Sequence, residues 1–335
     1  MKPFTVAIIG CGNISRMHFE ASLPHPERIQ VVAVCDAETE RVEEICRRYK
    51  VPHGFPSLGE MIARSAWEIG IVCTPTNVRS PVVETLAAAG KHIFVEKPFA
   101  DTYREAQTMV TTCEQAGVRI AVNQNFRYHY PFELAHSLVT QGEIGQVVSI
   151  AHHDLLFRQD SGWRTQLKRH ALSVMGVHWL DGFRRTLSDE AASVVCHTRS
   201  SQAIQCVGET DSSAIITFTR GALVSYVESF SALRERTETV VLGETGALVL
   251  TYDGLGLFDR DHRSTPRRHW ENPYRGSHKP EATFVGFDLF LTALEQGNES
   301  ANSGRDNLKT IALLDGAYRS AEEGRPVLFD KGVPL

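Results

Sequence analysis

The sequence predicts an α/β domain with a doubly wound parallel sheet over residues 1–123, and an α+β domain with a mainly antiparallel, open sheet over residues 124–335. Three observations lead to this fold class. An apolar run at the start of the chain ends in a glycine turn, short apolar runs then alternate with helical patterns as far as Asn123, and strands crowd together after it. Alternation is typical of parallel sheets covered by helices, whereas crowded strands with short turns are typical of antiparallel pairing.

The first element is a short buried strand over residues 4–9, because its residues are apolar, β-branched and too few for a helix. It leads into Gly10-Cys11-Gly12-Asn13-Ile14-Ser15, a G-x-G-x-x-[G/A] pattern with serine in the third place, and then into a helix over 16–23. Such glycines let the backbone approach a pyrophosphate, and the N–H groups at the helix start attract the anion. We therefore predict a Rossmann domain with Gly10, Cys11, Gly12, Asn13 and Ile14 in its cofactor site.

The second strand, over residues 30–35, ends on Asp36, about 20 residues after the glycine motif. A carboxylate at this place accepts hydrogen bonds from the ribose hydroxyls, so it suits NAD and repels the 2′-phosphate of NADP. Residues 37–40 contain no arginine, and Arg41 is the nearest cation that would favour NADP. The sequence therefore predicts NAD in preference to NADP.

Further along the first half, the predicted helices span 38–49, 58–64, 78–89 and 101–116, and the strands span 68–73, 91–95 and 119–122. Ligands of such sheets bind beyond the carboxyl ends of the strands. The polar residues that follow the strands are therefore candidates for the site: Asp36, Thr74, Asn77, Glu96, Lys97 and Asn123.

In the second half we predict helices over 130–140, 169–187, 283–296 and 306–322, and strands over 146–157, 193–196, 211–219, 223–230, 237–242 and 247–251. Glycines between the strands predict hairpin turns. The segment 259–280 is basic, rich in histidine and aperiodic, which predicts a loop.

The composition is that of a globular protein and limits the classes of partner. The 335 residues are 42% hydrophobic and 22% charged, with a formal net charge of -5, which argues against nucleic acid. No apolar run is long enough for a membrane helix, and we expect no signal peptide, because Met1-Lys2-Pro3 leads straight into the first strand. The seven cysteines are scattered without a metal-binding spacing, so we expect a cytoplasmic protein without a metal site.

Lys97 is the main candidate for catalysis in the first half. It follows a strand of the predicted parallel sheet, within Glu96-Lys97-Pro98. A lysine there either is an exposed surface charge or donates a hydrogen bond to the reacting oxygen, where its positive charge would stabilise alkoxide character.

Together, these motifs resemble those of the Gfo/Idh/MocA oxidoreductase family, along nearly the whole chain, and Glu96-Lys97-Pro98 is the most specific of them. The resemblance implies a nucleotide-binding domain, a sheet domain whose open face often forms homodimers or homotetramers, and a Lys97–Pro98 peptide that is able to be cis. The matching residues are the glycine turn, Asp36, Thr74-Pro75, Asn77, Glu96-Lys97-Pro98, Gln124-Asn125-Phe126-Arg127-Tyr128, Trp163-Arg164, His178 and Asp181.

The same resemblance implies which residues line the cofactor: Thr74, Pro75, Asn77, Arg79, Glu96, Lys97, Asn123, Trp163 and Arg164. Two of the positions in the first loop depart from the family, which usually has asparagine in place of Thr76 and histidine in place of Arg79. Arg79 either reaches a phosphate or a substrate acid, or is a solvated residue at the start of a helix.

His178 matches the family's acid/base histidine, and the resemblance implies that it takes the proton of the substrate hydroxyl. Val174, His178 and Asp181 share one side of the predicted helix. Asp181 either orients His178 or is an acid on the helix surface. The family has an aspartate in place of Val174, so three outcomes are open. His178 works with Lys97 alone, another group replaces the aspartate, or the chain binds cofactor without normal turnover.

Several cationic or titratable side chains lie near the expected substrate mouth: Arg158, Arg164, Lys168, Arg169 and His170. They form either a solvated face or a site for an acidic substrate, such as a sugar acid or a phosphorylated sugar, bound through arginine.

The sequence thus predicts an NAD-dependent dehydrogenase or reductase that transfers hydride between the cofactor and a secondary hydroxyl or ketone of a sugar, polyol or sugar acid. Two alternatives remain. One is a non-catalytic sensor or regulator that binds the dinucleotide, which Val174 favours. The other is a redox-assisted elimination or epimerisation of a sugar.

Overall fold

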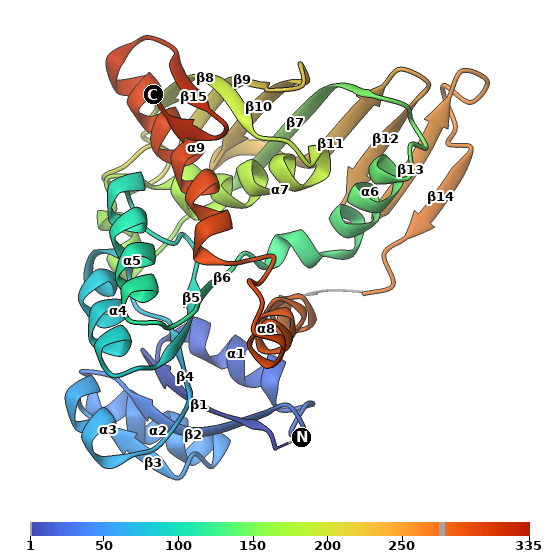
Figure 1. Ribbon diagram of the computed structural model, residues 1–335. Coiled ribbons are helices and arrows are strands. Elements are labelled where there is room, and N and C mark those ends of the chain that lie inside the picture. Colours follow the sequence, from blue (N-terminus) through green and yellow to red (C-terminus); the bar gives the residue numbers. More distant parts are fainter. Residues whose placement is uncertain (1, 275–278) are drawn as a thin grey trace. The chain divides into compact units, whose positions relative to one another are not determined.

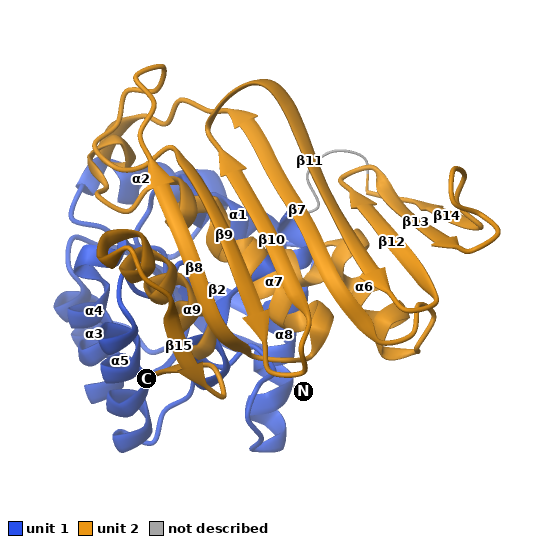
Figure 2. Cartoon of the chain, turned by 90° about the horizontal axis from the view of Figure 1, so that it is seen from above, with its two compact units in different colours: residues 1–125, 277–308 blue, residues 126–276, 309–335 orange. Residues whose placement is uncertain are grey.

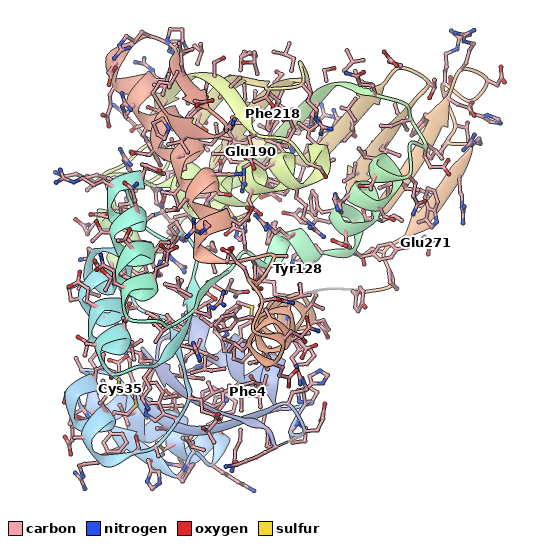
Figure 3. All side chains as sticks on the ribbon, in the orientation of Figure 1. Phe4, Cys35, Tyr128, Glu190, Phe218 and Glu271 are labelled. Atoms are coloured by element: carbon pink, nitrogen blue, oxygen red, sulfur yellow. The ribbon has the colours of Figure 1, made fainter. Side chains whose placement is uncertain are left out.

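The computed structural model describes residues 2–274 and 279–335. The chain forms two compact units, residues 1–125 with 277–308 and residues 126–276 with 309–335 (Figures 1 and 2). In each unit, side chains fill the space between the sheet and its helices (Figure 3). This division differs from the predicted domains, 1–123 and 124–335, because a segment from the end of the chain belongs to the first unit.

The sheet of the first unit has six parallel strands in the order β3-β2-β1-β4-β5-β6, so the predicted doubly wound sheet is confirmed. This order places β1 and β4 next to each other at the point where the strand order reverses, and ligands of such sheets bind there. The strands are β1 (Phe4–Ile9), β2 (Ile29–Cys35), β3 (His53–Phe55), β4 (Ile69–Val72), β5 (His92–Glu96) and β6 (Ile120–Asn123).

The helices between these strands follow the amphipathic patterns of the sequence: α1 (Asn13–Ser22), α2 (Thr39–Tyr49), α3 (Leu58–Arg64), α4 (Arg79–Ala88) and α5 (Tyr103–Gln115). A short 3₁₀ helix, η1 (Thr76–Val78), precedes α4. Thr102 caps α5 in a capping box with Glu105, which satisfies two backbone N–H groups at the helix start.

The core of the first unit includes a helix from the end of the chain, α8 (Lys279–Gln296). Its buried Phe287 and Phe290 pack with Phe94 of β5, at ring-centroid distances of 4.7 and 6.0 Å. Arg28 also binds Asp288 of α8 with a distance of 2.6 Å. The apolar pattern predicts this helix correctly, but a pattern does not tell which sheet the helix packs on.

The second unit is built on a ten-stranded sheet in the order β14-β13-β12-β11-β7-β10-β9-β8-β15-β16. Its pairs are antiparallel except for β7 with β10, which confirms the predicted mainly antiparallel sheet. The strands are β7 (Val147–Phe157), β8 (Ala191–Arg199), β9 (Asp211–Phe218), β10 (Leu223–Ser229), β11 (Ser231–Gly243), β12 (Gly246–Thr251), β13 (Gly254–Asp259), β14 (Arg268–Glu271), β15 (Val327–Asp330) and β16 (Val333–Pro334).

The predicted loop over residues 259–280 is wrong in part. It contains β14, which pairs with β13, and its end belongs to α8. Residues 275–278 of this segment lie outside the described residues. β14 has four residues at the edge of the sheet, and three of them are exposed, so it lacks the apolar alternation that identifies a half-buried strand.

One face of the ten-stranded sheet is covered by helices, chiefly α7 (Val177–Leu187), and α6 (Tyr130–Thr140) lies beside β12 and β13 (Figure 2). Trp179 and Phe183 of α7 pack on His152 of β7, at 4.4 and 5.4 Å between ring centroids. The last helix, α9 (Gly304–Glu323), begins in the first unit and continues in the second. No helix among the described residues is long and apolar enough to cross a membrane.

Candidate active site

The glycine turn after β1 has the geometry that a dinucleotide needs. Gly10 has φ +96°, and a Cβ there would lie 3.1 Å from the carbonyl carbon of Cys73, so only glycine fits. A Cβ on Gly12 would meet nothing within 4 Å, which leaves open space over the turn. α1 starts at Asn13 without a side-chain cap, so its first N–H groups remain available for an anion.

Asp36, the predicted ribose ligand, is held beside this turn. Its carboxylate oxygens accept hydrogen bonds from the backbone N–H of Cys11 at 2.7 Å and of Glu38 at 2.9 Å. Arg41, the cation that would favour NADP, instead forms an exposed ion pair with Glu38 at 2.8 Å. The glycine turn and Asp36 therefore fit NAD.

Glu96, at the carboxyl end of β5, is buried and hydrogen-bonded from two sides. Its Oε1 accepts from Nε2 of His18 at 2.8 Å and from Nδ2 of Asn123 at 2.7 Å. Burial alone raises the pKa of Glu96, but the hydrogen bond and charge of His18, the hydrogen bond of Asn123 and the charge of Lys97 outweigh it and lower this pKa. The carboxyl group is therefore ionised. Sequence reasoning missed His18, because a lone histidine inside a helix belongs to no motif.

Lys97 follows Glu96 and is half-buried. The Lys97–Pro98 peptide bond is cis, which confirms what the family resemblance implied. The lysine therefore stands at the carboxyl end of the parallel sheet, next to an ionised carboxylate.

Arg79 differs from the expectation that it binds the cofactor. Its guanidinium is buried and donates hydrogen bonds to the carbonyl oxygens of Thr74 (2.5 Å), Pro98 and Phe99 (3.3 Å). Burial lowers the pKa of Arg79 to about 10. The side chain connects the loop after β4 to the loop after β5, and we correct its role to holding these loops.

The other predicted cofactor residues of the first unit lie at these strand ends. Thr74 and Pro75 are half-buried, and Asn77 is exposed on η1. Within the described part of the chain, Oγ1 of Thr74 and Oδ1 of Asn123 are buried and accept or donate no hydrogen bond. Such atoms in a ligand-binding region are available to a cofactor.

In the second unit, His178 is buried near the start of α7 and stacks on Phe126, with 3.9 Å between ring centroids and 17° between planes. The predicted helix over 169–187 differs at its start, because residues 172–176 form one turn of π-helix, η4 (Leu172–Gly176). A Cβ on Gly176 would lie 2.6 Å from the hydroxyl of Tyr226 and 2.7 Å from the carboxylate of Glu228. This glycine therefore lets the turn before His178 lie close to β10.

Asp181 is buried, so the alternative that it is an acid on the helix surface is wrong, and its role in orienting His178 stays a prediction. Both of its oxygens bind Arg127, at 2.5 and 2.6 Å, and one also accepts from the hydroxyl of Thr310 at 2.7 Å. The pair with Arg127 is buried. Asp181 is therefore an internal ion-pair partner that fixes the segment containing Phe126.

Val174 lies in an apolar cluster with Ala171 and Phe230, where the family has an aspartate. Two buried carboxyl groups of this unit lie on the adjacent strands β7 and β10. Asp154 of β7 accepts from Nε1 of Trp179 at 3.0 Å, and Glu228 of β10 accepts from the hydroxyl of Tyr226. Burial raises the pKa of both carboxyl groups. Their sequence signal is a charged residue on the buried side of an alternating strand.

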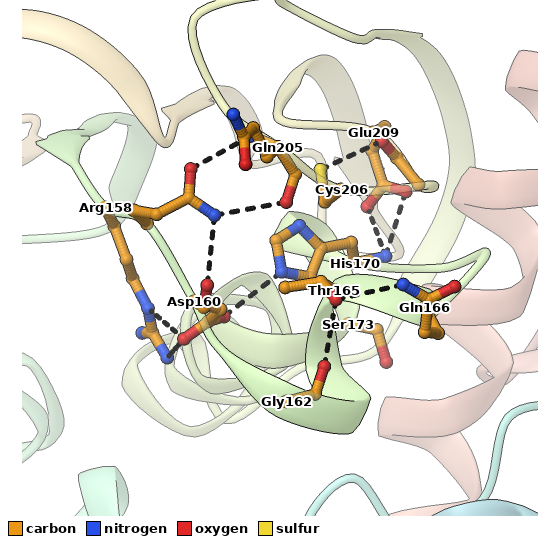
Figure 4. A network of polar contacts seen from close by, with 12 residues as sticks. Arg158, Asp160, Gly162, Thr165, Gln166, His170, Ser173, Gln205, Cys206 and Glu209 are labelled. Atoms are coloured by element: carbon orange, nitrogen blue, oxygen red, sulfur yellow. Dashed lines mark hydrogen bonds and ion pairs between the residues drawn. The ribbon is translucent and has the colours of Figure 1, made fainter.

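Two of the predicted substrate ligands bind the same carboxylate within the protein (Figure 4). Arg158 donates two hydrogen bonds to Oδ1 of Asp160, at 3.0 and 3.2 Å, and Nε2 of the buried His170 lies 3.1 Å from Oδ2. Burial raises the pKa of Asp160, but the His170 hydrogen bond and the Arg158 charge outweigh it and lower this pKa to about 2. Asp160 thus binds both side chains.

The remaining cations of this segment are dispersed. Arg169 binds Asp315 at 2.8 Å and lies over the ring of Tyr318, at 4.5 Å from its centroid. Arg164 and Lys168 are exposed, and Arg164 lies over the exposed ring of Trp163 at 5.5 Å. The residues predicted to bind an acidic substrate therefore do not form one cationic site.

A cavity of about 640 Å³ opens beside Asp160, between this segment and the loop after β8. Its polar lining consists of amide, hydroxyl and carboxylate groups, from Gln159, Asp160, Thr165, Gln166 and Gln205. A second cavity, of about 320 Å³, lies in the first unit between α5 and α8 and contains none of the candidate residues. Among the described residues, no group of three or more His, Cys, Asp or Glu side chains is arranged to hold a metal ion.

Comparison with known families decides the assignment. The model of the oxidoreductase family with an NAD-binding Rossmann fold matches residues 4–124, and that of the GFO/IDH/MocA C-terminal domain matches residues 132–249. The chain belongs to the Gfo/Idh/MocA oxidoreductase family. The predicted cofactor, NAD, and the predicted oxidoreductase class are those of this family.

Two similar members of the Gfo/Idh/MocA family are named as dehydrogenases of a sugar and of a polyol. D-apiose dehydrogenase of Paraburkholderia graminis is 30% identical over 98% of this chain and 90% of its own. Inositol 2-dehydrogenase of Rhizobium meliloti is 25% identical over 96% of this chain and 97% of its own. A solved oxidoreductase from Agrobacterium radiobacter, in complex with NAD⁺, L-tartaric acid and magnesium, has the same fold, with a TM-score of 0.90 and 22% identity over 98% of both chains.

Proposed function

We propose that this member of the Gfo/Idh/MocA family transfers hydride between NAD and a secondary hydroxyl or ketone of a neutral sugar or polyol. The observation that carries the proposal is the Glu96–Lys97 pair at the carboxyl end of β5, in the same sheet as the glycine turn and Asp36. The open space over Gly12 and the buried polar atoms of Thr74 and Asn123 suit NAD, which when bound supplies the hydride acceptor.

In this proposal Lys97 donates a hydrogen bond to the oxygen on the reacting carbon. Its positive charge stabilises the negative charge that develops on that oxygen. His178 takes the hydroxyl proton, for which an imidazole is suited near neutral pH. Phe126 holds the plane of the His178 ring, and Arg127 with Asp181 fixes Phe126 in turn. Trp163 and Arg164 remain proposed cofactor residues.

A neutral substrate is favoured over an acidic one. Asp160 already pairs with Arg158 and binds the imidazole of His170, and Asp315 binds Arg169. The nearby cavity presents amides, a hydroxyl and a carboxylate, and these groups bind sugar hydroxyls but attract no anion. The names of the similar apiose and inositol dehydrogenases support the same substrate class.

We also propose that the protein is a cytoplasmic homodimer or homotetramer. All seven cysteines are free, as expected in a reducing compartment. The outer face of the ten-stranded sheet exposes apolar side chains on neighbouring strands, which is the property of an association surface.

The test of the activity is NADH formation with a panel of neutral sugars and polyols, each paired with its uronic or aldonic acid. We expect turnover of a neutral member, with its acid partner turned over more slowly. Lys97→Met and His178→Asn should each lower kcat by about 100-fold or more, because each removes a group that acts on the reacting atoms. Lys50→Met, an exposed residue at the end of α2, is the matched control.

Other results would contradict the proposal in distinguishable ways. Tight NADH binding without turnover of any carbohydrate supports a non-catalytic sensor, consistent with Val174 in place of the family's aspartate. Substrate conversion without net release of NADH supports elimination or epimerisation through a transient keto sugar. Faster turnover of the uronic or aldonic acids than of the neutral compounds supports the alternative that the substrate is acidic.

A further inference from the structure

His18 is the one buried histidine of α1, and it contacts the segment that carries Lys97. It is 1% exposed, and its Nε2 donates to Oε1 of Glu96. His18 lies six residues after Gly12, so a single helix joins the pyrophosphate-binding turn to the carboxylate beside the catalytic lysine.

The Glu96 carboxylate is fixed by donors from two different elements. His18 approaches Oε1 from α1 and Asn123 approaches it from β6, at 2.8 and 2.7 Å. Asn123 is itself held by the hydroxyl of Thr283 of α8 at 3.4 Å. Neither donor binds Oε2. Two donors on one oxygen determine the rotation of the carboxylate and direct its other oxygen away from them.

Stability alone does not account for this arrangement. Burying a carboxylate together with its hydrogen-bond donors costs desolvation energy, and apolar residues of similar volume often give equal or greater stability. The core around His18 is apolar and includes Phe94, whose ring lies 6.1 Å from the imidazole. A leucine or phenylalanine would therefore suit the packing of α1. The hydrogen bond to Glu96 is what the imidazole adds.

We propose that His18 is a positioning residue for the reaction. Together with Asn123 it orients the Glu96 carboxylate, and through it Lys97, towards the nicotinamide half of NAD. The proposal rests on the proposed function of Lys97. It assigns His18 no contact with the cofactor or the substrate.

The test compares two ligands with three variants. Isothermal titration gives the affinities for NADH, which has both halves of the dinucleotide, and for ADP, which has only the half that binds at the glycine turn. For His18→Leu we expect NADH affinity to fall about tenfold, as for the loss of one hydrogen bond to a charged group, with ADP affinity unchanged within about twofold. His18→Gln places an amide N–H near the Nε2 position and should restore most of the loss. His53→Leu, an exposed histidine of β3 in the same unit, is the control.

The pH profile gives a second readout that a packing defect would not change. In the wild type the His18 donor keeps the pKa of Glu96 below its ordinary value. Without that donor, burial dominates and the pKa of Glu96 rises. The acid limb of kcat/KM in His18→Leu should therefore shift to higher pH, and the limb of His18→Gln should stay near that of the wild type.

Three results would overturn the proposal. One is an equal loss of NADH and ADP binding, one is no loss in His18→Leu, and one is a His18→Gln variant as weak as His18→Leu. If His18→Leu does not fold, His18→Asn keeps a polar side chain that is too short to reach Glu96 and should weaken NADH more than ADP. The binding data do not depend on turnover. If no sugar or polyol of the panel is turned over, the proposed function is refuted, but the role of His18 is still decided by the binding data.

Discussion

At the scale of single residues, Asp160 shows why a cluster of cations in sequence is not a cationic site in space. Arg158 and His170 both bind its carboxylate, whose side chain is 9% exposed. A carboxylate that accepts hydrogen bonds from a guanidinium and an imidazole is held in its ionised form, and its negative charge offsets that of Arg158. Arg158 and His170 therefore form contacts within the protein and are not available to an anionic ligand.

The lowered pKa of Asp160 leads to a prediction about acid stability. The pKa falls from an ordinary 3.8 to about 2, so its contribution is complete above about pH 4 and is lost as the pH falls towards 2. We expect the wild type to exceed Asp160→Asn in free energy of unfolding by roughly 2 kcal/mol at pH 5 to 7, and this difference to shrink below pH 4. Urea unfolding of both proteins at several pH values measures it.

The comparison at pH 5 and 5.5 is the internal control, since both values lie above the pKa of Asp160 in the folded and in the unfolded protein and should give nearly the same difference. A difference that stays constant down to the lowest pH at which both proteins fold would contradict the assigned ion pairs. A difference in unfolding free energy that grows at low pH would have the opposite pH dependence and would exclude these contacts of Asp160.

Patterns in the sequence predicted the roles of some residues of the candidate site but not the contacts of others. The roles of Gly10 and Asp36 were predictable, because a glycine turn followed by a carboxylate at this spacing is typical of dinucleotide binding. Those of Asp181 and Arg79 were not. Their partners, Arg127 and the carbonyls of Thr74 and Phe99, lie on other elements, and only the fold determines which charges meet.

At the scale of elements, the helix that carries His178 was predictable in extent but not in its first turn. The apolar spacing of residues 172–183 gives a helix, whereas the π-helical turn over 172–176 depends on contacts with β10. π-helical turns frequently occur at functional sites. Gly176 permits the contact, because its Cα faces the hydroxyl of Tyr226 and the carboxylate of Glu228.

Gly176→Ala should therefore destabilise the second unit. The added Cβ would lie 2.6 Å from the Tyr226 hydroxyl and 2.6 Å from Cδ1 of Leu172, so the turn has to move. We expect a loss of roughly 1–3 kcal/mol in the free energy of unfolding, as for overpacking in a core, and a lower kcat because His178 follows two residues later. Urea unfolding and steady-state kinetics measure the two effects.

Gly182→Ala is the matched control on α7. Nothing lies within 4 Å of its added Cβ, so alanine should stabilise the helix by up to about 1 kcal/mol. If both substitutions changed the free energy of unfolding equally, the effect of Gly176→Ala would come from helix propensity and not from the contact with β10.

At the scale of the whole molecule, the order of the elements along the chain was more predictable than their grouping into two units. Alternating strands and helices led to the six-stranded parallel sheet, and crowded strands led to the antiparallel one. The return of α8 to the first unit was not predictable, because its apolar face complements either core equally well by pattern. Phe287 and Phe290 identify their partner only through contact with Phe94.

The outer face of the ten-stranded sheet carries the last prediction. Val195, Ile215 and Val227 lie on the adjacent strands β8, β9 and β10, are 36–46% exposed, and point away from the helices. Leu223 and Leu242 extend the apolar surface towards β10 and β11. Such a surface matches a second copy of itself, because one patch then serves both partners.

We therefore expect sedimentation velocity at micromolar concentration to give at least twice the chain mass of 37.3 kDa for the wild type. The double variant Ile215→Lys with Val227→Lys should sediment as a monomer, because lysines at the centre of a buried face leave unpaired charges in the interface. Leu23→Lys, an exposed leucine of the first unit, should keep the wild-type mass. A monomeric wild type, or a double variant that retains its mass, would show that this face is not the interface.

Since the two lysines lie on the face opposite α7, NADH binding to the monomer should be retained, and its loss would show that association also supports the cofactor site.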